Sequence, residues 1–179
     1  MKVLIASDIH GSAKYCKLLL DAYRKEGAEK LMLLGDILYH GPRNPLPEEY
    51  NPMKVVELLT EIKDQIIGVQ GNCDAEVDKM VLPYKMGTTF NLTFIDGRPF
   101  ILLHGHNDFY NPTPNKIVLT GHTHVPLKEV GEYIHLNPGS VSLPKEGSPH
   151  SYILYDNGKF LFKNLETGET YDELEIMMS

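Results

Sequence analysis

Five short polar clusters in the sequence each follow directly after an apolar run, and together they hold seven side chains able to bind a metal ion. These side chains are two carboxylates, one amide and four imidazoles: Asp8, His10, Asp36, Asn72, His104, His122 and His124. Imidazole nitrogen combined with carboxylate and amide oxygen suits manganese, iron, zinc or nickel better than a soft metal. We therefore predict that the clusters bind a transition metal.

The apolar runs before the clusters predict strands buried on both faces, because they are continuous and rich in leucine or β-branched residues. They read Val3-Leu4-Ile5-Ala6, Leu31-Met32-Leu33-Leu34, Ile66-Ile67-Gly68-Val69, Phe100-Ile101-Leu102-Leu103 and Ile117-Val118-Leu119. An open α/β sheet binds its ligands beyond the carboxyl ends of its strands. We therefore expect all five clusters to meet at one edge and to form one site.

The number of donors favours a pair of metal ions over a single ion. Seven ligands exceed the four of a tetrahedral ion and suit two ions that share a bridge. Two like cations ~3.5–4 Å apart repel each other strongly, so the bridge should be negatively charged. Asp36 lies centrally in the motif order and is the natural candidate. A hydroxide shared by two ions can attack phosphorus in line, which makes phosphoester hydrolysis the favoured reaction.

The remaining patterns predict two halves of different architecture. A helix is expected between Ser12, its N-cap, and Gly27, and a second helix is expected to begin at Pro52. This β-α-β-α-β alternation predicts a parallel sheet. Beyond residue 85, alternating strands and the turns Asp96-Gly97 and Asn157-Gly158 predict mostly antiparallel pairing. We expect an α/β fold of two mixed β-sheets packed face to face and flanked by helices.

Length and composition limit the class of protein. The 179 residues suit a single domain over residues 1–179, and 42% hydrophobic with 23% charged residues is an ordinary globular balance. The net charge of -7 argues against binding long nucleic acid, which needs a basic surface. The two cysteines, Cys16 and Cys73, are too few for a disulfide framework. No apolar stretch approaches the ~20 residues that span a membrane. We expect a cytoplasmic protein with reduced thiols.

The ordered set D-x-H, G-D, G-N-C-D, H-G-H and G-H-T-H resembles the motifs of the calcineurin-like metallophosphoesterases. The match spans residues 8–124, and the size of the chain makes it similar to the small prokaryotic phosphodiesterases of the YfcE type. The resemblance implies a four-layer α/β/β/α sandwich with a dinuclear metal centre, and manganese is expected ahead of iron, zinc and nickel. It places four ligands on the first metal, Asp36 among them as the bridge, and three on the second: Asp8, His10, Asp36 and His124, then Asn72, His104 and His122.

The chain departs from the better-known members of this family at two positions that affect the leaving group. Phosphoprotein phosphatases carry a histidine, the proposed general acid, where this chain has Cys73, and an orienting aspartate where it has Tyr39. A thiol is a weak hydrogen-bond donor without positive charge. Fewer cations around the phosphate favour a singly charged diester over a doubly charged monoester. We therefore predict a metal-dependent phosphodiesterase that hydrolyses small phosphodiesters with a hydroxide bound to a dinuclear metal centre.

Several residues near the predicted centre have roles that the sequence leaves open. Cys73 is the candidate catalytic residue, touching phosphate or relaying a proton, but a passive small residue or a thiolate metal ligand also fits. Arg43 is either a phosphate clamp or a solvated loop residue. His106 is expected to bind substrate near the centre without binding metal, and Asn72 to contact both. Asp74 is expected to hydrogen-bond a ligand histidine or to cap the following helical turn.

Alternative functions share the site or the fold. A phosphomonoesterase or a cyclic-nucleotide phosphodiesterase would use the same metal centre. A protein-interaction scaffold similar to the retromer vacuolar sorting subunit would use the fold alone, but here all seven ligand positions hold residues able to bind metal. The expected partner is a small phosphodiester, with no membrane involved. The natural substrate, the native metal and a homo-oligomeric state stay open.

Overall fold

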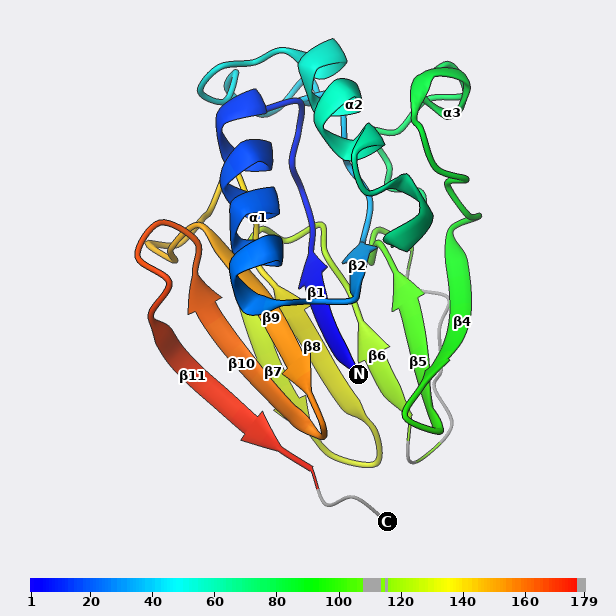
Figure 1. The fold of residues 1–179 in the computed structure, drawn as a ribbon, viewed down its shortest axis with the longest axis vertical. Helices are drawn as coiled ribbons and strands as arrows, with labels where there is room; N and C mark the ends of the chain where they lie inside the picture. The colour runs from blue at the N-terminus through cyan, green and yellow to red at the C-terminus, as the bar shows by residue number, and fades with distance from the viewer. Residues whose placement is uncertain (108–113, 115, 177–179) are drawn as a thin grey trace.

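The computed structural model describes residues 1–107, 114 and 116–176 and contains two β-sheets packed face to face (Figure 1). The six-stranded sheet has the order β11-β10-β9-β1-β2-β3, with the bounds Thr170–Glu175, Lys159–Asn164, Ser151–Asp156, Lys2–Ala6, Lys30–Leu33 and Ile66–Gly68. The five-stranded sheet has the order β4-β5-β6-β8-β7, with the bounds Phe90–Ile95, Arg98–Leu103, Ile117–Leu119, Ile134–Pro138 and Pro126–Val130.

Both sheets mix parallel and antiparallel pairs, as the sequence predicts. β1 runs parallel to β2 and β2 to β3, whereas β9 runs antiparallel to β1. In the other sheet β5, β6 and β8 are parallel, and β4 and β7 pair antiparallel at the edges. The predicted turns Asp96-Gly97 and Asn157-Gly158 join β4 to β5 and β9 to β10, with positive φ at all four residues. The sequence does not predict β11, because its TYDELE segment carries three acidic residues.

The two long helices begin where the sequence predicts. The Ser12 hydroxyl accepts a hydrogen bond from the backbone N–H of Tyr15, and Gly27 ends the first helix with a left-handed φ of 65°. The Asn51 side chain caps the second helix, which has a proline in its first turn. The helical segments are α1 (Ala13–Glu26), α2 (Pro52–Thr60), the 3-10 turn η1 (Lys63–Gln65) and the short α3 (Asp78–Val81).

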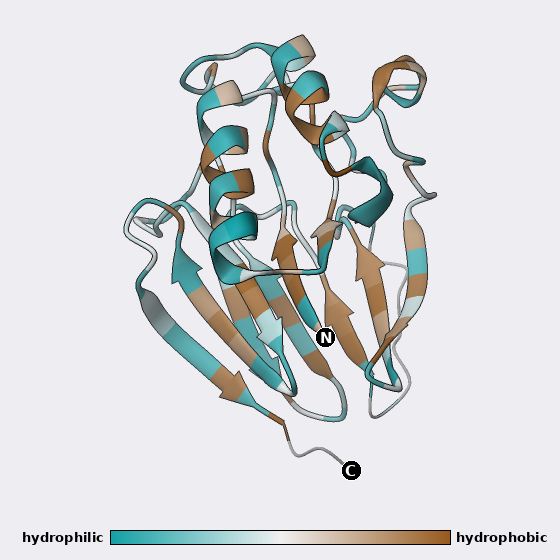
Figure 2. Cartoon of the chain, in the orientation of Figure 1, coloured by the Kyte–Doolittle hydropathy of each residue, from teal (hydrophilic) through white to brown (hydrophobic). Residues whose placement is uncertain are grey.

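Two hydrophobic layers lie on the two faces of the six-stranded sheet. α1 and α2 cover its outer face (Figure 1), where Leu19 and Leu59 share a core with Leu4 of β1. On its inner face, Ile5 of β1 shares a second core with Phe100 of the five-stranded sheet. Strand β1 is therefore buried on both faces, and Figure 2 shows the central strands as largely hydrophobic. This burial explains the continuous apolar runs in the sequence.

The predicted α/β class with two mixed sheets is confirmed. The helices of the described residues lie mainly on the six-stranded sheet, and they supply no comparable layer on the outer face of the five-stranded sheet (Figure 1). None of the helices in residues 1–107, 114 and 116–176 is both long and apolar enough to cross a membrane.

Candidate metal centre

The five polar clusters lie at the carboxyl ends of strands from both sheets. β1, β2 and β3 belong to the six-stranded sheet and β5 and β6 to the five-stranded sheet. Figure 1 shows the carboxyl ends of β1, β2, β5 and β6 at the same end of the molecule, and β3 runs parallel to β2. The site therefore forms across two packed sheets, where the sequence suggested one edge of one sheet. The strands deliver the seven predicted donors in chain order: Asp8, His10, Asp36, Asn72, His104, His122 and His124.

The backbone at five of these donors is left-handed. The φ angles are 59° at Asp8, 49° at His10, 56° at Asp36, 69° at His122 and 63° at His124. A non-glycine residue is uncommon in this region, because its Cβ crowds the following carbonyl. Such residues persist only where the surrounding structure determines them, and they concentrate at functional sites. The turns after β1, β2 and β6 are therefore shaped to aim side chains at a common point.

Glycines in the clusters allow the turns to approach one another. A Cβ on Gly71 would lie 2.1 Å from Oδ1 of Asp36, and a Cβ on Gly121 would lie 1.9 Å from the hydroxyl of Ser7. Neither contact is possible for any other residue type without moving the backbone. The polar clusters therefore need these glycines to bring their turns into contact.

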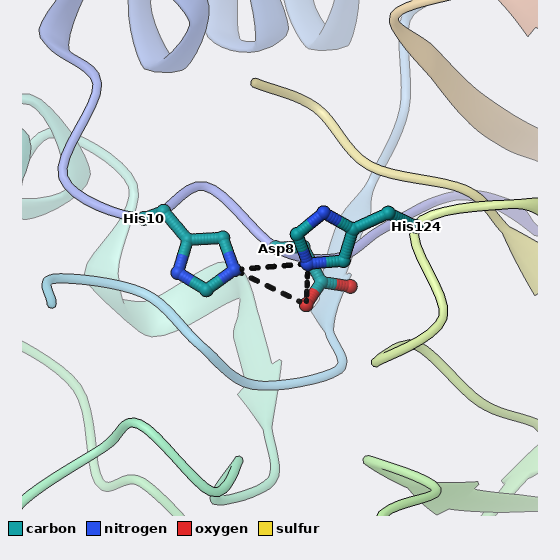
Figure 3. A group of neighbouring side chains, drawn as sticks. All are labelled: Asp8, His10 and His124. Atoms are coloured by element: carbon teal, nitrogen blue, oxygen red, sulfur yellow. Dashed lines mark hydrogen bonds and ion pairs between the residues drawn. The ribbon is translucent and has the colours of Figure 1, made fainter. Parts of the chain in front are cut away.

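Three buried donors form the first group of the centre. Asp8, His10 and His124 each offer one ligand atom, all within 4.8 Å of one another, and Figure 3 shows the two rings and the carboxylate converging. Nε2 of His10 lies 3.1 Å from Nε2 of His124. Oδ1 of Asp8 lies 3.6 Å from Nε2 of His10 and 3.3 Å from Nε2 of His124. All three side chains are almost fully buried.

The hydrogen bonds of three histidine rings fix which nitrogen faces the centre. In each ring Nδ1 lies within hydrogen-bond distance of a backbone carbonyl: His10 with Tyr39 at 2.8 Å, His104 with Leu34 at 2.6 Å and His124 with Leu143 at 2.6 Å. A carbonyl only accepts, so Nδ1 carries the hydrogen and Nε2 of the neutral ring presents a lone pair. Two lone pairs facing each other across 3.1 Å repel unless a proton or a cation lies between them. Metal-binding histidines characteristically donate their other ring N–H in this way.

The carboxylate of Asp8 also fits a metal. Its Oδ2 accepts a hydrogen bond from the backbone N–H of His122 at 3.0 Å, whereas its Oδ1 is buried and has no hydrogen-bond partner in the part of the chain that the structure describes. Burial disfavours ionisation, but the attraction of the nearby His10 and His124 rings outweighs it and holds the pKa of Asp8 well below its usual range. A buried, ionised oxygen without a hydrogen bond is costly in a protein interior. A cation beside it would remove that cost.

Asp36 lies between the first group and a second group, which consists of His104 and Asn72. Its Oδ2 is 3.3 Å from Nε2 of His104 and 3.7 Å from Nε2 of His10, and its Oδ1 accepts from the backbone N–H of Cys73 at 2.9 Å. Burial lowers the pKa of His104, but hydrogen bonding to Asp36 and nearby negative charge outweigh it and raise the value to about 9. Nε2 of His104 also lies 3.1 Å from Oδ1 of Asn72. Asp36 thus lies within 4 Å of a histidine of each group, which is the position expected for the predicted bridge.

His122 and His106 lie close to this second group but are less buried. The His122 ring centroid is 5.1 Å from that of His104, and the His106 centroid is 5.5 Å from that of His104. Among the described residues, neither ring belongs to the groups whose ligand atoms lie within 4.8 Å of one another. Burial lowers the pKa of both rings, and the positive charge of His104 adds to the effect. Six of the seven predicted donors, Asn72 through its contact with His104, thus meet directly, and His122 lies at the edge.

An open cleft of ≈ 970 Å³ leads to the centre and is lined by Asp36, Cys73, His122 and Arg43, among others. Cys73 is half-buried beside Asp36, and its thiol joins His10 and Asp36 in a group of ligand-type atoms. Burial and the negative charge of Asp36 raise the pKa of this thiol to about 12. Arg43 is exposed at the cleft, consistent with either of its predicted roles.

Asp74 has a different role from the two expected for it. Its carboxylate accepts hydrogen bonds from three backbone N–H groups, those of Asp36 at 2.7 Å, Ile37 at 2.8 Å and Gly71 at 2.7 Å. Among the described residues, this carboxylate has no hydrogen bond with a ligand histidine and none that caps the following helical turn, so both expectations are wrong. The carboxylate instead joins the turn after β2 to the turn after β3. Sequence spacing does not reveal this role, because the partners are main-chain atoms of a distant turn.

Asn137 and two serines were not predicted and hold the remaining turns. Nδ2 of Asn137 donates to the carbonyl of Gly121 at 2.7 Å, at the start of the turn after β6. The hydroxyls of Ser140 and Ser142 donate to the carbonyl of Asp8 at 2.9 and 3.1 Å. The signal in the sequence is a run of small polar residues that follows a strand and is fully buried. Outer partners of this kind orient metal ligands.

The fold and the donor set define a class of protein. The family model of the calcineurin-like phosphoesterase superfamily domain matches residues 1–159, and the chain belongs to this family. Phosphodiesterase YfcE of Escherichia coli strain K12 is 44% identical over 164 residues, which cover 88% of each chain. The solved structure of this E. coli phosphoesterase superposes with a TM-score of 0.94 at 41% identity and covers 99% of this chain and 100% of that one.

More distant structures share the fold alone. The zinc complex of Vps29 from Entamoeba histolytica has a TM-score of 0.67 at 18% identity and covers 98% of this chain and 99% of that one. The same architecture thus occurs in a protein named for vacuolar sorting. The fold alone therefore does not define the function of this chain.

Proposed function

We propose that this chain is a metal-dependent phosphodiesterase that hydrolyses small phosphodiesters with two divalent ions, manganese ahead of iron, zinc and nickel. Asp8, His10, Asp36, Asn72, His104, His122 and His124 would hold the ions, with Asp36 as the bridge. The observation that carries this proposal is the pair of buried Nε2 atoms 3.1 Å apart beside the unpartnered Oδ1 of Asp8. Nitrogen and oxygen donors arranged in this way suit those metals.

The bound ions would supply an activated water near neutral pH and would neutralise the charge of the phosphate. The protein contributes orientation through the backbone carbonyls that fix three histidine rings. Asn72, His106 and Arg43 would bind the substrate, since Asn72 and Arg43 line the cleft and His106 lies beside His104. Each can donate a hydrogen bond to a phosphate oxygen.

Cys73 is the proposed catalytic contact at the wall of the cleft. Its thiol is a weak hydrogen-bond donor and cannot supply the positive charge of a protonated histidine. A doubly charged monoester would therefore gain little extra stabilisation at this position, which favours a singly charged diester. The 44% identity to a relative named phosphodiesterase supports the same preference.

Hydrolysis of two chromogenic substrates tests this proposal. Purified protein, stripped with chelator and reloaded with Mn²⁺, is assayed with bis(p-nitrophenyl) phosphate and with p-nitrophenyl phosphate. We expect turnover that needs the metal and a kcat/KM at least about ten-fold higher for the diester. A preference for the monoester would replace the phosphodiesterase with a phosphomonoesterase. Bound metal without turnover of either ester, or no bound metal, would favour a protein-interaction scaffold.

Three further properties belong to the same proposal. The chain would act as one domain over residues 1–179, because the two cores share strands of one sheet. It would work in the cytoplasm with both cysteines reduced; both are unpaired within the described residues. Sedimentation analysis of the metal-loaded protein decides whether it forms a homo-oligomer.

A further inference from the structure

Two cationic side chains, Arg43 and Lys145, line the cleft that leads to the candidate metal centre. Neither forms an ion pair with any residue in the described part of the chain. Most other cations do: nine lysines and arginines are within 4.0 Å of a carboxylate, namely Lys2, Lys14, Lys17, Arg24, Lys54, Lys79, Lys128, Lys159 and Lys163. The cleft therefore carries two positive charges that no carboxylate of the described residues pairs with, in a chain of net charge -7.

The loop that carries Arg43 is packed against the centre. Nδ2 of Asn44 donates to the carbonyl of His40 at 2.8 Å and closes a tight turn around Arg43. At the base of this turn, a Cβ on Gly41 would lie 2.9 Å from Sγ of Cys73. The backbone next to Arg43 thus touches the wall of the donor cluster, which holds the guanidinium near the cleft.

The loop that carries Lys145 is tied to a donor histidine. The backbone N–H of Lys145 donates to the carbonyl of His124 at 3.2 Å, and the His124 ring donates to the carbonyl of Leu143 at 2.6 Å. The hydroxyl of Ser148 contacts the carbonyls of both Lys145, at 2.6 Å, and His124, at 3.4 Å. The same short segment therefore orients a proposed metal ligand and presents an ammonium group to the cleft.

The cleft is larger than a single phosphate group requires. Its volume of ≈ 970 Å³ lies at the upper end of the range for pockets that hold a small-molecule ligand, roughly 300–1,000 Å³. Among the described residues, Asp36 and Asp74 are the carboxylates that line it, and both are buried and engaged with the turns of the centre. An anion bound away from the metal ions would thus meet Arg43 and Lys145 on the exposed walls. Guanidinium and ammonium groups are the side chains that recognise phosphate and carboxylate.

We propose that Arg43 and Lys145 form an anion subsite, which binds a second negatively charged group of the substrate beyond the ester that is cleaved. This inference rests on the proposed phosphodiesterase function and narrows its substrate class. The substrate would be a small diester with a phosphate or a carboxylate on the alcohol that extends along the cleft. Each of the two loops contributes one cation to the lining of the cleft.

A binding experiment tests the subsite without turnover. Manganese-loaded protein is titrated calorimetrically with 3-phosphonopropionate and with propylphosphonate, which lacks the carboxylate but has the same carbon chain. We expect the former to bind at least about five-fold more tightly, and the ratio to fall toward one in Lys145→Gln and in Arg43→Gln. Lys63→Gln is the matched control, because Lys63 is exposed in η1, just before the amino end of β3, and is unpaired among the described residues. Propane-1,3-bisphosphonate, titrated in parallel, distinguishes a phosphate from a carboxylate as the second group.

Equal affinities for the two phosphonates in the wild type, or an affinity ratio that survives both substitutions, would overturn the subsite.

A kinetic experiment separates failure of the subsite from failure of the proposed function. It uses two p-nitrophenyl diesters whose second alcohol ends in a carboxylate or in the matching carboxamide. We expect the kcat/KM ratio of the pair to fall about five-fold in Lys145→Gln. Phosphonate selectivity without hydrolysis of either diester would support the subsite and reject the phosphodiesterase, whereas hydrolysis of both without selectivity would do the reverse.

Discussion

Among the described residues, one partly buried and one fully buried cluster of polar side chains differ in what satisfies their polar atoms. Where α1 meets the six-stranded sheet, Oε1 of Glu26 accepts hydrogen bonds from the Lys163 ammonium and, at 3.0 Å, from the Tyr152 hydroxyl. At the carboxyl ends of the strands, Oδ1 of Asp8 has no hydrogen-bond partner and two histidine Nε2 atoms face each other across 3.1 Å. The first cluster is complete with protein atoms, whereas the second needs a proton or a cation at its centre.

The backbone shows the same difference. Glu26 is the last residue of a regular helix, and its partners lie in β9 and β10, so the cluster stands on ordinary secondary structure. The donor cluster stands on five left-handed residues, among them Asp8 and Asp36. Strain of this kind costs stability and is retained where function needs the geometry. We infer that the Glu26 cluster serves stability and the donor cluster serves metal binding, and the predictions below test that division.

The largest effect is expected for Asp36→Asn. The amide keeps the shape of the side chain but removes the negative charge shared between the two groups of donors. Loss of an outer partner of a metal ligand costs about 10- to 100-fold, so loss of the bridge itself should lower diesterase kcat/KM by more than about 100-fold. Metal content per chain, measured by mass spectrometry, should fall in parallel. Glu26→Gln is the matched control and should keep both values near those of the wild type.

Asp74→Asn should produce the next largest effect. The amide cannot accept from the backbone N–H groups of Asp36, Ile37 and Gly71 at once, so the turns after β2 and β3 should loosen. We expect affinity for Mn²⁺ to fall about 10- to 100-fold in a competition assay with a fluorescent chelator. Asp78→Asn removes a neighbouring buried carboxylate whose hydrogen-bond donor in the described residues is the backbone N–H of Ala75, and it should leave the affinity intact. Equal losses of Mn²⁺ affinity in Asp74→Asn and Asp78→Asn would show that a buried carboxylate in this segment matters more than the hydrogen bonds that Asp74 accepts from the two turns.

Metal should stabilise the protein through the donor cluster alone. Mn²⁺ at 100 times its dissociation constant adds about 2.7 kcal/mol to the free energy of unfolding. For a chain of this size that is an increase in Tm of about 5–10 °C, measured by scanning calorimetry with and without chelator. The increase should persist in Glu26→Gln and disappear in Asp36→Asn. A wild-type Tm that does not respond to any of the four proposed metals would contradict the assignment of the donor cluster.

The two clusters also differ in how well the sequence predicts them. The donor types can be read directly, because each polar cluster follows an apolar run and strand ends bring such clusters together. The helix caps at Ser12 and Asn51 and the Asp96-Gly97 turn follow from local chemistry in the same way. Local chemistry does not reveal that the clusters come from two sheets, because the pairing of strands depends on contacts between distant residues.

The supporting residues are harder to predict than the donors. Asp74 and Asn137 bind backbone atoms of other turns, and those partners depend on the path of the chain in space. The same holds for Glu26 and Tyr152, which are 126 residues apart in the sequence. His122 matches its motif, yet its ring lies at the edge of the cluster, and the contact between His122 and Asp8 is made by the backbone N–H of His122. Motifs therefore predict donor identity better than they predict geometry.

Glu26→Gln should destabilise the fold without affecting the metal. The substitution removes the negative charge beside the Lys163 ammonium. Both side chains of this ion pair are largely buried, with 13% of Lys163 and 15% of Glu26 exposed. Removing one partner of such a pair costs about 1–3 kcal/mol. Urea denaturation of the metal-free protein should show this loss as a lower midpoint with an unchanged slope. Lys14→Gln, which removes a pair formed by a partly exposed lysine and an exposed glutamate, is the control and should cost less than about 1 kcal/mol.

The smallest effect is the pH dependence of the same cluster. Burial raises the pKa of Glu26, but hydrogen bonds from Lys163 and Tyr152 outweigh it, so the pKa in the folded state lies below its ordinary value of 4.5. The folded state therefore binds fewer protons than the unfolded state in this range, and stability falls as the pH falls. The stabilisation is fully present above the unfolded pKa and is lost as the pH drops through the folded pKa.

The difference in unfolding free energy between wild type and Glu26→Gln, measured without metal, should thus be constant from pH 7 to pH 5. This difference should shrink toward pH 3. Because the donor cluster is the same in both proteins, the titration of the donor cluster cancels in the difference. A difference that grows on acidification would mean that Glu26 is held by contacts which do not depend on its charge.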